Sequence, residues 1–325
     1  MSALLDVQDL SVDFPTRRGR LHALDRVSLS IQPGEILGVV GESGAGKSLT
    51  GAAIIGLLEP PGVIVGGQVS LEGRRIDKLP PEQMRRIRGR QIGAVFQDPL
   101  TTLNPLYTVG RQLVETMQTH LGLSDRDAKA RAVQWLVDVG IPGAAERVDA
   151  YPHEFSGGMR QRVVIALALC AEPKLVIADE PTTALDVSIQ AQVIALLRRL
   201  AREHGTAVLL VTHDMGVIAE TCDRVAVMYA GRVIEVGSVA AVVHRPSHPY
   251  TEGLMASIPA LRARVDRLAQ IDGAMPRLNA IPPGCAYNPR CPKVFERCRH
   301  DRPNLMPAKE TQAACWLYAE GAVHG

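Results

Sequence analysis

Apolar and polar residues alternate along two segments near the start of the chain. Residues 4–14 (LLDVQDLSVDF) and 22–31 (HALDRVSLSI) show this period of two, and the turn-like segment PTRRGR separates them. Alternation predicts half-buried antiparallel strands with one face in the core. Residues 67–76 (GQVSLEGRRI) repeat the pattern after a Pro/Gly-rich turn. We therefore expect an antiparallel β subdomain in the N-terminal part.

Three short runs are continuously apolar instead of alternating. They are ILGVVG at residues 36–41, KLVIAD at 174–179 and AVLLVTHD at 207–214. Continuous runs are typical of parallel strands that helices cover on both faces. Because helix-like sequence separates the runs, the pattern predicts a doubly wound α/β core.

The stretch of about residues 98–171, between the first and second runs, is mostly helical in pattern. Within it, a capping box of Ser124 and Asp127 predicts the start of a helix that ends at Gly140. We expect a helical subdomain here. Further along, residues 224–237 predict two strands joined at Ala230-Gly231.

Composition shifts near Val239. The rest of the chain contains about half of the 22 prolines and four of the six cysteines. The predicted organisation is therefore a core domain over residues 1–240 and a small Cys/Pro-rich region over residues 241–325.

Composition and charge exclude several classes of protein. Hydrophobic residues make up 46% of the chain and charged residues 22%, as in globular proteins. Lys and Arg total 36 against 34 Asp and Glu, so charge gives no reason to expect a nucleic-acid partner. The best apolar run, Val163–Ala171, is too short to span a bilayer. Acidic residues at the N-terminus do not fit a signal peptide, so we expect a cytosolic chain with reduced cysteines.

The segment GESGAGKS at residues 41–48 fits the phosphate-binding pattern G-x-x-x-x-G-K-[ST]. It follows a buried-type strand and opens a helix, which is the context that this motif requires. Glycines let backbone N–H groups surround phosphates, Lys47 reaches the outer phosphates, and the Ser48 hydroxyl binds Mg²⁺. With only six lysines in the chain, a chance match is rare. The predicted nucleotide-binding residues are Gly41, Glu42, Ser43, Gly44, Ala45, Gly46, Lys47 and Ser48.

The second apolar run ends in two acids, Asp179 and Glu180. Such a pair is often only an exposed turn. Beside a phosphate-binding loop, however, Asp179 suits the Mg²⁺ shell and Glu180 suits the polarisation of a water molecule. We therefore predict that both belong to the nucleotide site.

Four further motifs resemble those of the nucleotide-binding subunits of ABC transporters. FSGGMRQR at residues 155–162 resembles the family's signature and lies 23 residues before Asp179, counted from Ser156. Gln97 matches the Q-loop, Asp186 the D-loop and His213 the switch histidine. The resemblance covers about residues 4–240, with every motif in order. It implies a P-loop NTPase core of the ABC ATPase type, with ATP and Mg²⁺ as cofactors.

The resemblance also implies roles for these residues. Two such domains stack head to tail, so that Ser156, Gly157 and Gly158 of one chain, followed by Asp186, face ATP held by the other. Glu180, His213 and Gln97 are then the catalytic group: Glu180 orients or deprotonates water, and His213 contacts the γ-phosphate. Mg²⁺ is held through Ser48, Gln97 and Asp179. Gln97 also connects the metal site to the surface that touches membrane subunits.

The sequence departs from the family pattern in two places. Phe155 and Met159 stand where the signature usually has Leu and Gln. No aromatic residue lies near Arg18, where the family usually stacks one on adenine. Phe14, His22 or a cation–π contact of Arg18 are the alternatives for the base.

The segment HRPSHPYTEGLMASIP at residues 244–259 resembles the tail of the oligopeptide/dipeptide importers. A solvated linker is the alternative interpretation of this segment. The resemblance implies an ATPase subunit at the cytoplasmic face of the inner membrane, peripherally bound. Its implied partners are a second homologous ATPase, two permease subunits and an extracytoplasmic binding protein. The transported solute stays open, and nickel chelates, glutathione or sugars are alternatives to di- and oligopeptides.

Four cysteines in the C-terminal region, separated by 5, 6 and 16 residues, favour a four-thiolate metal site. Spacing alone leaves the metal open. Some members of the resembling family carry a [4Fe–4S] cluster here, which favours iron–sulfur over zinc or free thiols. We expect such a cluster to be structural, with basal ATP chemistry independent of it. The predicted ligands are Cys285, Cys291, Cys298 and Cys315.

Two rival functions come from other classes. One is a soluble ABC ATPase that acts on DNA, ribosomes or cluster assembly. Such proteins tend to carry tandem cassettes, coiled-coil insertions or basic arms, and this sequence has none of these. The other rival is a redox or iron sensor in which the cysteine region is primary and the ATPase is attached.

Overall fold

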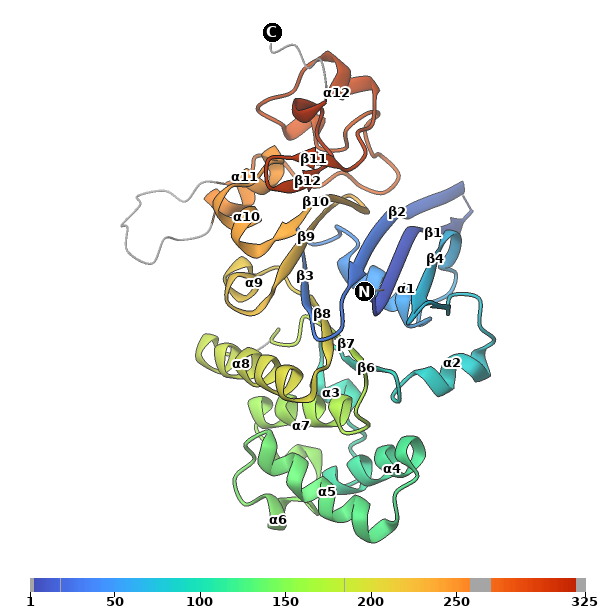
Figure 1. Cartoon of the computed structure of the whole chain (residues 1–325), viewed down its shortest axis with the longest axis vertical. Helices are drawn as coiled ribbons and strands as arrows, with labels where there is room; N and C mark the ends of the chain where they lie inside the picture. Colours follow the sequence, from blue (N-terminus) through green and yellow to red (C-terminus); the bar gives the residue numbers. More distant parts are fainter. Residues whose placement is uncertain (1–2, 18, 184, 258–269, 320–325) are drawn as a thin grey trace. The chain divides into compact units, whose positions relative to one another are not determined.

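The computed structural model describes residues 3–17, 19–183, 185–257 and 270–319. The described residues form two compact units, each assembled from separated stretches of the chain (Figure 1). The first unit is built mainly from residues 78–211, with residues 31–36 added. The second unit is built from residues 5–30, 37–77 and the described part of 212–325.

The second unit contains an antiparallel sheet of four strands in the order β2-β1-β4-β5. Strand β1 pairs with β4 from Leu5 opposite Leu71 to Asp13 opposite Val63. Leu5 and Val7 are buried, as are Leu10 and Val12, so the period of two holds on each side of a register irregularity near Asp9. This sheet confirms the expected antiparallel β subdomain. Its strands are β1 (Leu5–Thr16), β2 (Gly19–Ile31), β4 (Val63–Leu71) and β5 (Arg74–Arg75).

The same unit contains a second run of strands in the order β3-β9-β10-β12-β11. Strand β3 is buried throughout and pairs in parallel with β9, whereas the other pairs are antiparallel. Glu235 of β10 lies opposite Ala313 of β12. The C-terminal region thus extends a sheet of the core. The strands are β3 (Ile36–Val40), β9 (Arg224–Tyr229), β10 (Arg232–Ser238), β11 (Met306–Ala308) and β12 (Thr311–Ala313).

Helices of the second unit are mostly short, and Figure 1 labels the α-helices among them. They are α1 (Lys47–Ile54), α9 (Met215–Thr221), α10 (Val239–His244), α11 (Pro249–Ala256), α12 (Glu296–His300) and the 3₁₀ turns at Asn288–Arg290 and Trp316–Tyr318.

The first unit contains three parallel strands in the order β8-β7-β6. Their side chains are almost entirely buried, as expected for continuous apolar runs, and α7 packs against β6 and α8. The strands are β6 (Ile92–Val95), β7 (Leu175–Asp179) and β8 (Ala207–Val211). The helices are α2 (Pro81–Ile87), α3 (Pro99–Thr102), α4 (Val109–Leu121), α5 (Asp125–Asp138), α6 (Ala144–Arg147), α7 (Gly157–Leu169), α8 (Val187–His204) and the 3₁₀ turn at Pro152–Glu154.

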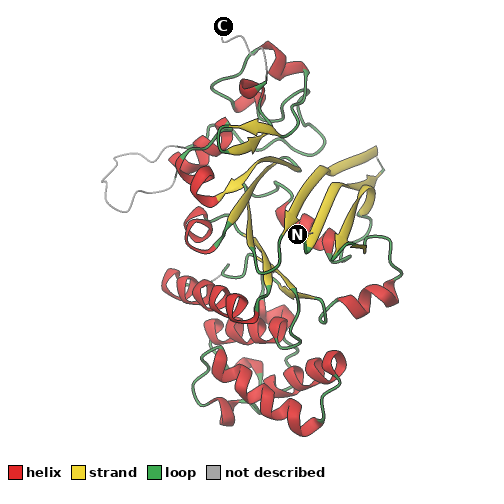
Figure 2. Ribbon diagram, in the orientation of Figure 1, coloured by secondary structure: helices red, strands yellow, loops and turns green. Residues whose placement is uncertain are grey.

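The predicted helical subdomain is present as the group of α4, α5, α6 and α7, in which α4 and α5 pack on each other and on α7 (Figure 2). Helix α5 begins at the predicted cap, because the Ser124 hydroxyl accepts a hydrogen bond from the Asp127 N–H at 3.2 Å. Its buried residues Ala128, Ala132, Trp135 and Leu136 follow the helical period and form one apolar stripe. No helix within the described residues is long and apolar enough to cross a membrane.

Candidate nucleotide site

The phosphate-binding loop runs from the end of β3 into α1, as predicted. Gly41 and Gly46 have φ angles of +157° and +101°. A Cβ atom on Gly41 would lie 2.3 Å from the Met228 carbonyl oxygen, and one on Gly46 would lie 2.7 Å from Leu24 Cδ2. Only glycine fits this close approach of the loop to its neighbours.

Lys47 is the first residue of α1 and is only 6% exposed. Its ammonium group donates hydrogen bonds to the carbonyl oxygens of Gly41 (2.9 Å) and Glu42 (3.1 Å). The positive charge of Lys47 therefore lies inside the loop, beside the N-terminus of α1. The lysine charge and the positive end of the helix dipole both favour binding of an anion here. This arrangement fits the phosphate chain of ATP.

The two acids at the end of β7 differ in backbone conformation. Asp179 is the last residue of the strand, whereas Glu180 has a φ of +44° and its N–H donates to the Val211 carbonyl at 2.8 Å. A positive φ is costly for glutamate, by about 1–3 kcal/mol, so the surrounding structure must hold this turn.

The Glu180 carboxylate accepts hydrogen bonds from two neighbours. The Thr183 hydroxyl lies at 2.9 Å and the Gln97 amide at 3.3 Å, both from Oε2. The structure therefore brings Gln97 and Glu180 together, as the resemblance implies. Sequence reasoning missed Thr183, although its position three residues after Glu180 is a local signal.

The signature segment starts α7. The Ser156 hydroxyl caps the helix by accepting from the Met159 N–H at 3.3 Å, and both Ser156 and Gly157 are exposed. A helix N-terminus displayed in this way can meet a phosphate. Phe155 is 3% exposed, so it takes the buried apolar place of the usual leucine.

Two further predicted residues lie at helix starts. Asp186 occupies the N-cap position of α8 without a side-chain capping bond. His213 is exposed and precedes Asp214, which caps α9 by accepting from the Gly216 N–H at 2.7 Å. This cap fixes the start of α9, directly after His213.

Comparison with known proteins identifies the family to which this arrangement belongs. Residues 24–183 match the family model of the ABC transporter, and residues 234–298 match that of the oligopeptide/dipeptide transporter C-terminal region. The dipeptide transport ATP-binding protein DppD of Escherichia coli is 45% identical over 314 residues, 96% of each chain. The oligopeptide transport ATP-binding protein OppD of Haemophilus influenzae is 46% identical, covering 98% of this chain and 99% of that one. The chain belongs to the oligopeptide/dipeptide family of ABC transporter ATP-binding proteins.

Solved structures show the same fold for this ABC ATPase. A dimeric bacterial ABC transporter cassette, MJ0796, is 28% identical, with a TM-score of 0.64 over 72% of this chain and 98% of that one. CbiO1 from Clostridium perfringens is 29% identical, with a TM-score of 0.64 over 75% of this chain. The predicted ABC ATPase fold is thus confirmed, and ATP hydrolysis is the activity of the chain.

The predicted Mg²⁺ ligands of the ABC ATPase are divided between the two units. Ser48 belongs to the second unit, whereas Gln97 and Asp179 belong to the first. Each lies at the end of a strand or the start of a helix, and a hydroxyl, an amide and a carboxylate suit Mg²⁺. Their joint coordination stays a prediction.

The candidates for the adenine contact differ in their surroundings. A Cβ on Gly62 would lie 2.9 Å from two Phe14 ring atoms, so the Phe14 ring packs directly against the backbone at Gly62. His22 has a side chain 69% exposed, and its Nδ1 lies 2.7 Å from the Asp13 carboxylate. Arg18 lies outside the described residues. His22 is therefore the more accessible ring.

The predicted iron–sulfur site is not supported. In the described residues, which include all six cysteines, no group of three or more His, Cys, Asp or Glu side chains could hold a metal ion. Burial, aided by the other thiols of the C-terminal region, raises the pKa of Cys285 to about 11 and that of Cys315 to about 12. Cys285 and Cys291 pack against one apolar cluster of the C-terminal region, and Cys315 belongs to another.

Two C-terminal residues that sequence reasoning missed contact the phosphate-binding loop. Tyr250 accepts a hydrogen bond from the Glu42 N–H at 2.9 Å, and Arg290 forms an ion pair with the Glu42 carboxylate at 3.1 Å. These contacts join residues 208 and 248 positions apart. No local sequence signal points to them.

Proposed function

We propose that this ABC ATPase is the energy-coupling subunit of an importer for di- and oligopeptides. The observation that carries this proposal is the presence of both family matches in one chain, the ABC domain and the peptide-transporter C-terminal region. Relatives named for dipeptide and oligopeptide transport cover nearly the whole chain. Importers of nickel chelates or glutathione are the alternatives within the same architecture.

The proposed catalytic cycle assigns each group one task. Lys47 and the N–H groups at the start of α1 bind the β- and γ-phosphates. Bound Mg²⁺, held by Ser48, Asp179 and Gln97, would neutralise charge on these phosphates. Glu180 accepts or orients the proton of the attacking water while Thr183 and Gln97 keep its carboxylate in place.

A second ATPase chain completes the site in this proposal. The exposed start of α7, with Ser156 and Gly157, donates backbone N–H groups to the γ-phosphate bound by the other chain, near its Asp186. His213 contacts the same phosphate from the chain that binds it. The second ATPase is a homologous but different subunit. Light scattering of the purified chain with ATP, alone and with a candidate second subunit, separates this heterodimer from a homodimer.

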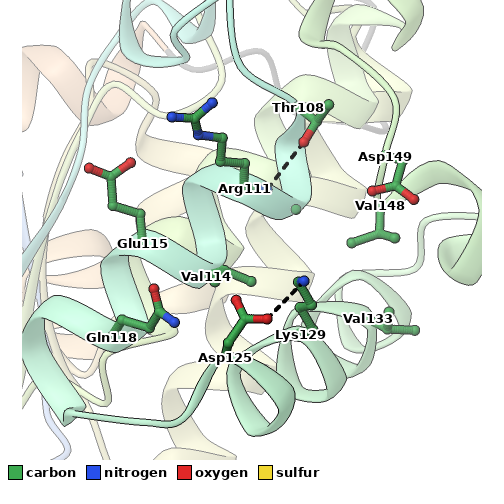
Figure 3. Close-up of a pocket in the computed structure, with 11 residues that line it drawn as sticks. Thr108, Arg111, Val114, Glu115, Gln118, Asp125, Lys129, Val133, Val148 and Asp149 are labelled. Carbon is green, nitrogen blue, oxygen red and sulfur yellow. Dashed lines mark hydrogen bonds and ion pairs between the residues drawn. The ribbon is translucent and has the colours of Figure 1, made fainter.

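Two permease subunits and an extracytoplasmic binding protein are the remaining proposed partners, so the chain lies peripherally at the inner membrane. A cavity of about 610 Å³ in the first unit supports a permease contact. Figure 3 shows Arg111, Glu115 and Gln118 projecting from α4 while Lys129 of α5 pairs with Asp125. Positively and negatively charged side chains surround the apolar Val114 and Val133, and this mixture suits a short amphipathic segment from a permease.

The leucine just before α4 is the expected anchor of that contact. Leu106 is 79% exposed, and it lies two residues before Thr108, which lines the cavity. An exposed leucine of this kind contributes little to folding but favours burial in an interface. We therefore propose that Leu106 is buried against the permease segment.

Complementation of a strain that lacks this gene tests both the importer and the permease contact. The deletion should abolish growth on peptides as amino-acid source, and wild type should restore it. Leu106→Asp should lower peptide uptake at least about tenfold and weaken co-purification with the permeases. Val137→Asp is the matched control for an exposed apolar residue of the helical group, because Val137 of α5 is 53% exposed.

The outcomes separate the two proposals. Normal peptide uptake in the deletion strain, with loss of nickel-chelate or glutathione uptake, would reassign the solute. Full uptake by Leu106→Asp, with a functional wild-type control, would remove the permease contact from this surface and leave the importer assignment standing.

Anaerobic purification of the full chain tests the finer prediction of an iron–sulfur cluster. The family resemblance predicts that the protein purified without oxygen is brown, with broad absorbance near about 400 nm and about four irons and four sulfides per chain. A colourless protein without metal, whose four C-terminal thiols react with an alkylating reagent, would remove both the cluster and the four-thiolate site. One zinc per chain would establish a four-thiolate zinc site. Cys291→Ser should remove either metal, whereas the buried control Cys170→Ser should not.

A further inference from the structure

One peptide unit of the phosphate-binding loop is held from both sides. Its carbonyl belongs to Gly41 and accepts a hydrogen bond from Lys47 Nζ at 2.9 Å. Its N–H belongs to Glu42 and donates to the Tyr250 hydroxyl at 2.9 Å. Because a peptide unit is planar, a rotation that breaks one bond also misplaces the other group. Tyr250 therefore restrains the carbonyl to which the phosphate-binding lysine is bonded.

The side chain of the same loop residue is held independently. The Arg290 guanidinium donates to both Glu42 carboxylate oxygens, at 3.1 Å each. Arg290 is itself anchored, because its Nε donates to the Asp272 carbonyl at 2.8 Å and its Nη1 donates to the Tyr229 hydroxyl at 3.3 Å. Its side chain is only 7% exposed. A bidentate pair of this kind is directional as well as strong.

Three buried tyrosines support both contacts. Tyr229, Tyr250 and Tyr287 pack edge to face, with ring centroids 4.8–5.4 Å apart, and none is more than 3% exposed. Such close-packed aromatic clusters have few alternative side-chain arrangements. Tyr287 lies between Cys285 and Cys291 in the sequence, and Arg290 directly precedes Cys291. The packing therefore connects the cysteine segment to the phosphate-binding loop.

We propose that the C-terminal region positions the phosphate-binding loop for ATP, with Tyr250 and Arg290 acting through Glu42 as positioning residues. The nucleotide affinity of this ABC ATPase then depends on these two contacts and not on the general stability of the C-terminal region. The sequence-based expectation that basal ATP chemistry is independent of the cluster is a separate prediction. The loop is preset before ATP arrives, so less of the binding free energy is used to order it.

Equilibrium binding of a fluorescent ATP analogue to the full chain tests the proposal. Arg290→Gln should weaken binding about tenfold, because it leaves the Glu42 carboxylate unpaired beside the phosphates and removes the restraint. Tyr250→Phe should weaken it about fivefold by leaving the Glu42 N–H without its acceptor. In the assembled complex, both variants should raise the KM for ATP more than they lower kcat, as expected for lost binding rather than lost chemistry.

A double-mutant cycle decides whether Arg290 acts through Glu42. In a Glu42→Gln background, Arg290→Gln should have less than about a twofold further effect. Arg290→Lys should bind more tightly than Arg290→Gln but less tightly than wild type, because lysine keeps the positive charge but cannot form the bidentate pair with Glu42. A full tenfold further loss in the Glu42→Gln background would overturn the mechanism.

Arg302→Gln is the matched control for general loosening of the region. Arg302 binds the Asp25 carboxylate at 2.7 Å and the Gly284 carbonyl at 3.1 Å, and neither residue belongs to the phosphate-binding loop. This variant should bind the ATP analogue within about twofold of wild type at an unchanged or lowered melting temperature. Equal weakening by Arg302→Gln, or unchanged affinity in both Arg290→Gln and Tyr250→Phe, would refute the positioning role. If Arg290→Gln does not fold, Arg290→Lys and Tyr250→Phe carry the same comparison.

Discussion

Glu180→Gln is expected to bind ATP with near wild-type affinity and to hydrolyse it at least about 100-fold more slowly. Glutamine keeps the shape of the side chain and can still meet Thr183 and Gln97, but it cannot accept a proton from water. ATP should therefore remain bound and the closed ATPase dimer should accumulate. Single-turnover hydrolysis in the assembled complex, together with size-exclusion chromatography in ATP, measures both effects.

A matched glutamate substitution controls for the loss of a negative charge. Glu203 is an exposed carboxylate at the end of α8 that pairs with Arg199 at 3.0 Å. Glu203→Gln should leave turnover within about twofold, because exposed pairs of this kind contribute little. Near wild-type turnover by Glu180→Gln in the complex would remove Glu180 from the catalytic role.

Lys47→Ala should weaken ATP binding by about two orders of magnitude. The ammonium group lies inside the loop at 2.9 Å from the Gly41 carbonyl oxygen, where it meets the phosphates before as well as during hydrolysis. Its loss therefore lowers affinity and not only the rate. Isothermal titration with ATP and, separately, with adenosine measures the effect, because adenosine lacks the phosphates and should bind equally weakly to both proteins.

Two additional variants separate charge from packing at this position. Lys47→Met keeps most of the side-chain volume of a residue that is 6% exposed, and it should lose ATP affinity to the same extent as alanine. Lys78→Ala removes an exposed lysine after β5 and should bind ATP normally. Unchanged ATP affinity in Lys47→Met would show that the charge of Lys47 does not contact the phosphates.

Local patterns were sufficient to predict much of the nucleotide site. The strand ending before Gly41 and the strand ending at Asp179 are continuous apolar runs, and both exist as β3 and β7. A motif that follows such a strand has its backbone geometry set by neighbouring residues. The start of α5 at Ser124 was predictable for the same reason, since a cap bond spans only three residues.

The spacing of the four C-terminal cysteines is not sufficient by itself to establish a metal site. Four cysteines over 31 residues fit a metal site in sequence, yet no such group is present among the described side chains. Spacing sets which residues can meet, whereas side-chain direction and burial decide whether they do. Burial raises the pKa values of the Cys285 and Cys315 thiols, an effect that depends on packing and not on spacing.

The sequence by itself determined the order of the motifs, the buried strands and the chemistry of Lys47, Asp179 and Glu180, because these depend on residues close together in the chain. The tertiary structure alone decided that Tyr250 and Arg290 reach Glu42 across 208 and 248 positions. It also decided that the C-terminal strand β12 extends the sheet at β10. Contacts at such separations depend on how whole elements pack, and packing leaves no periodic signal in one sequence.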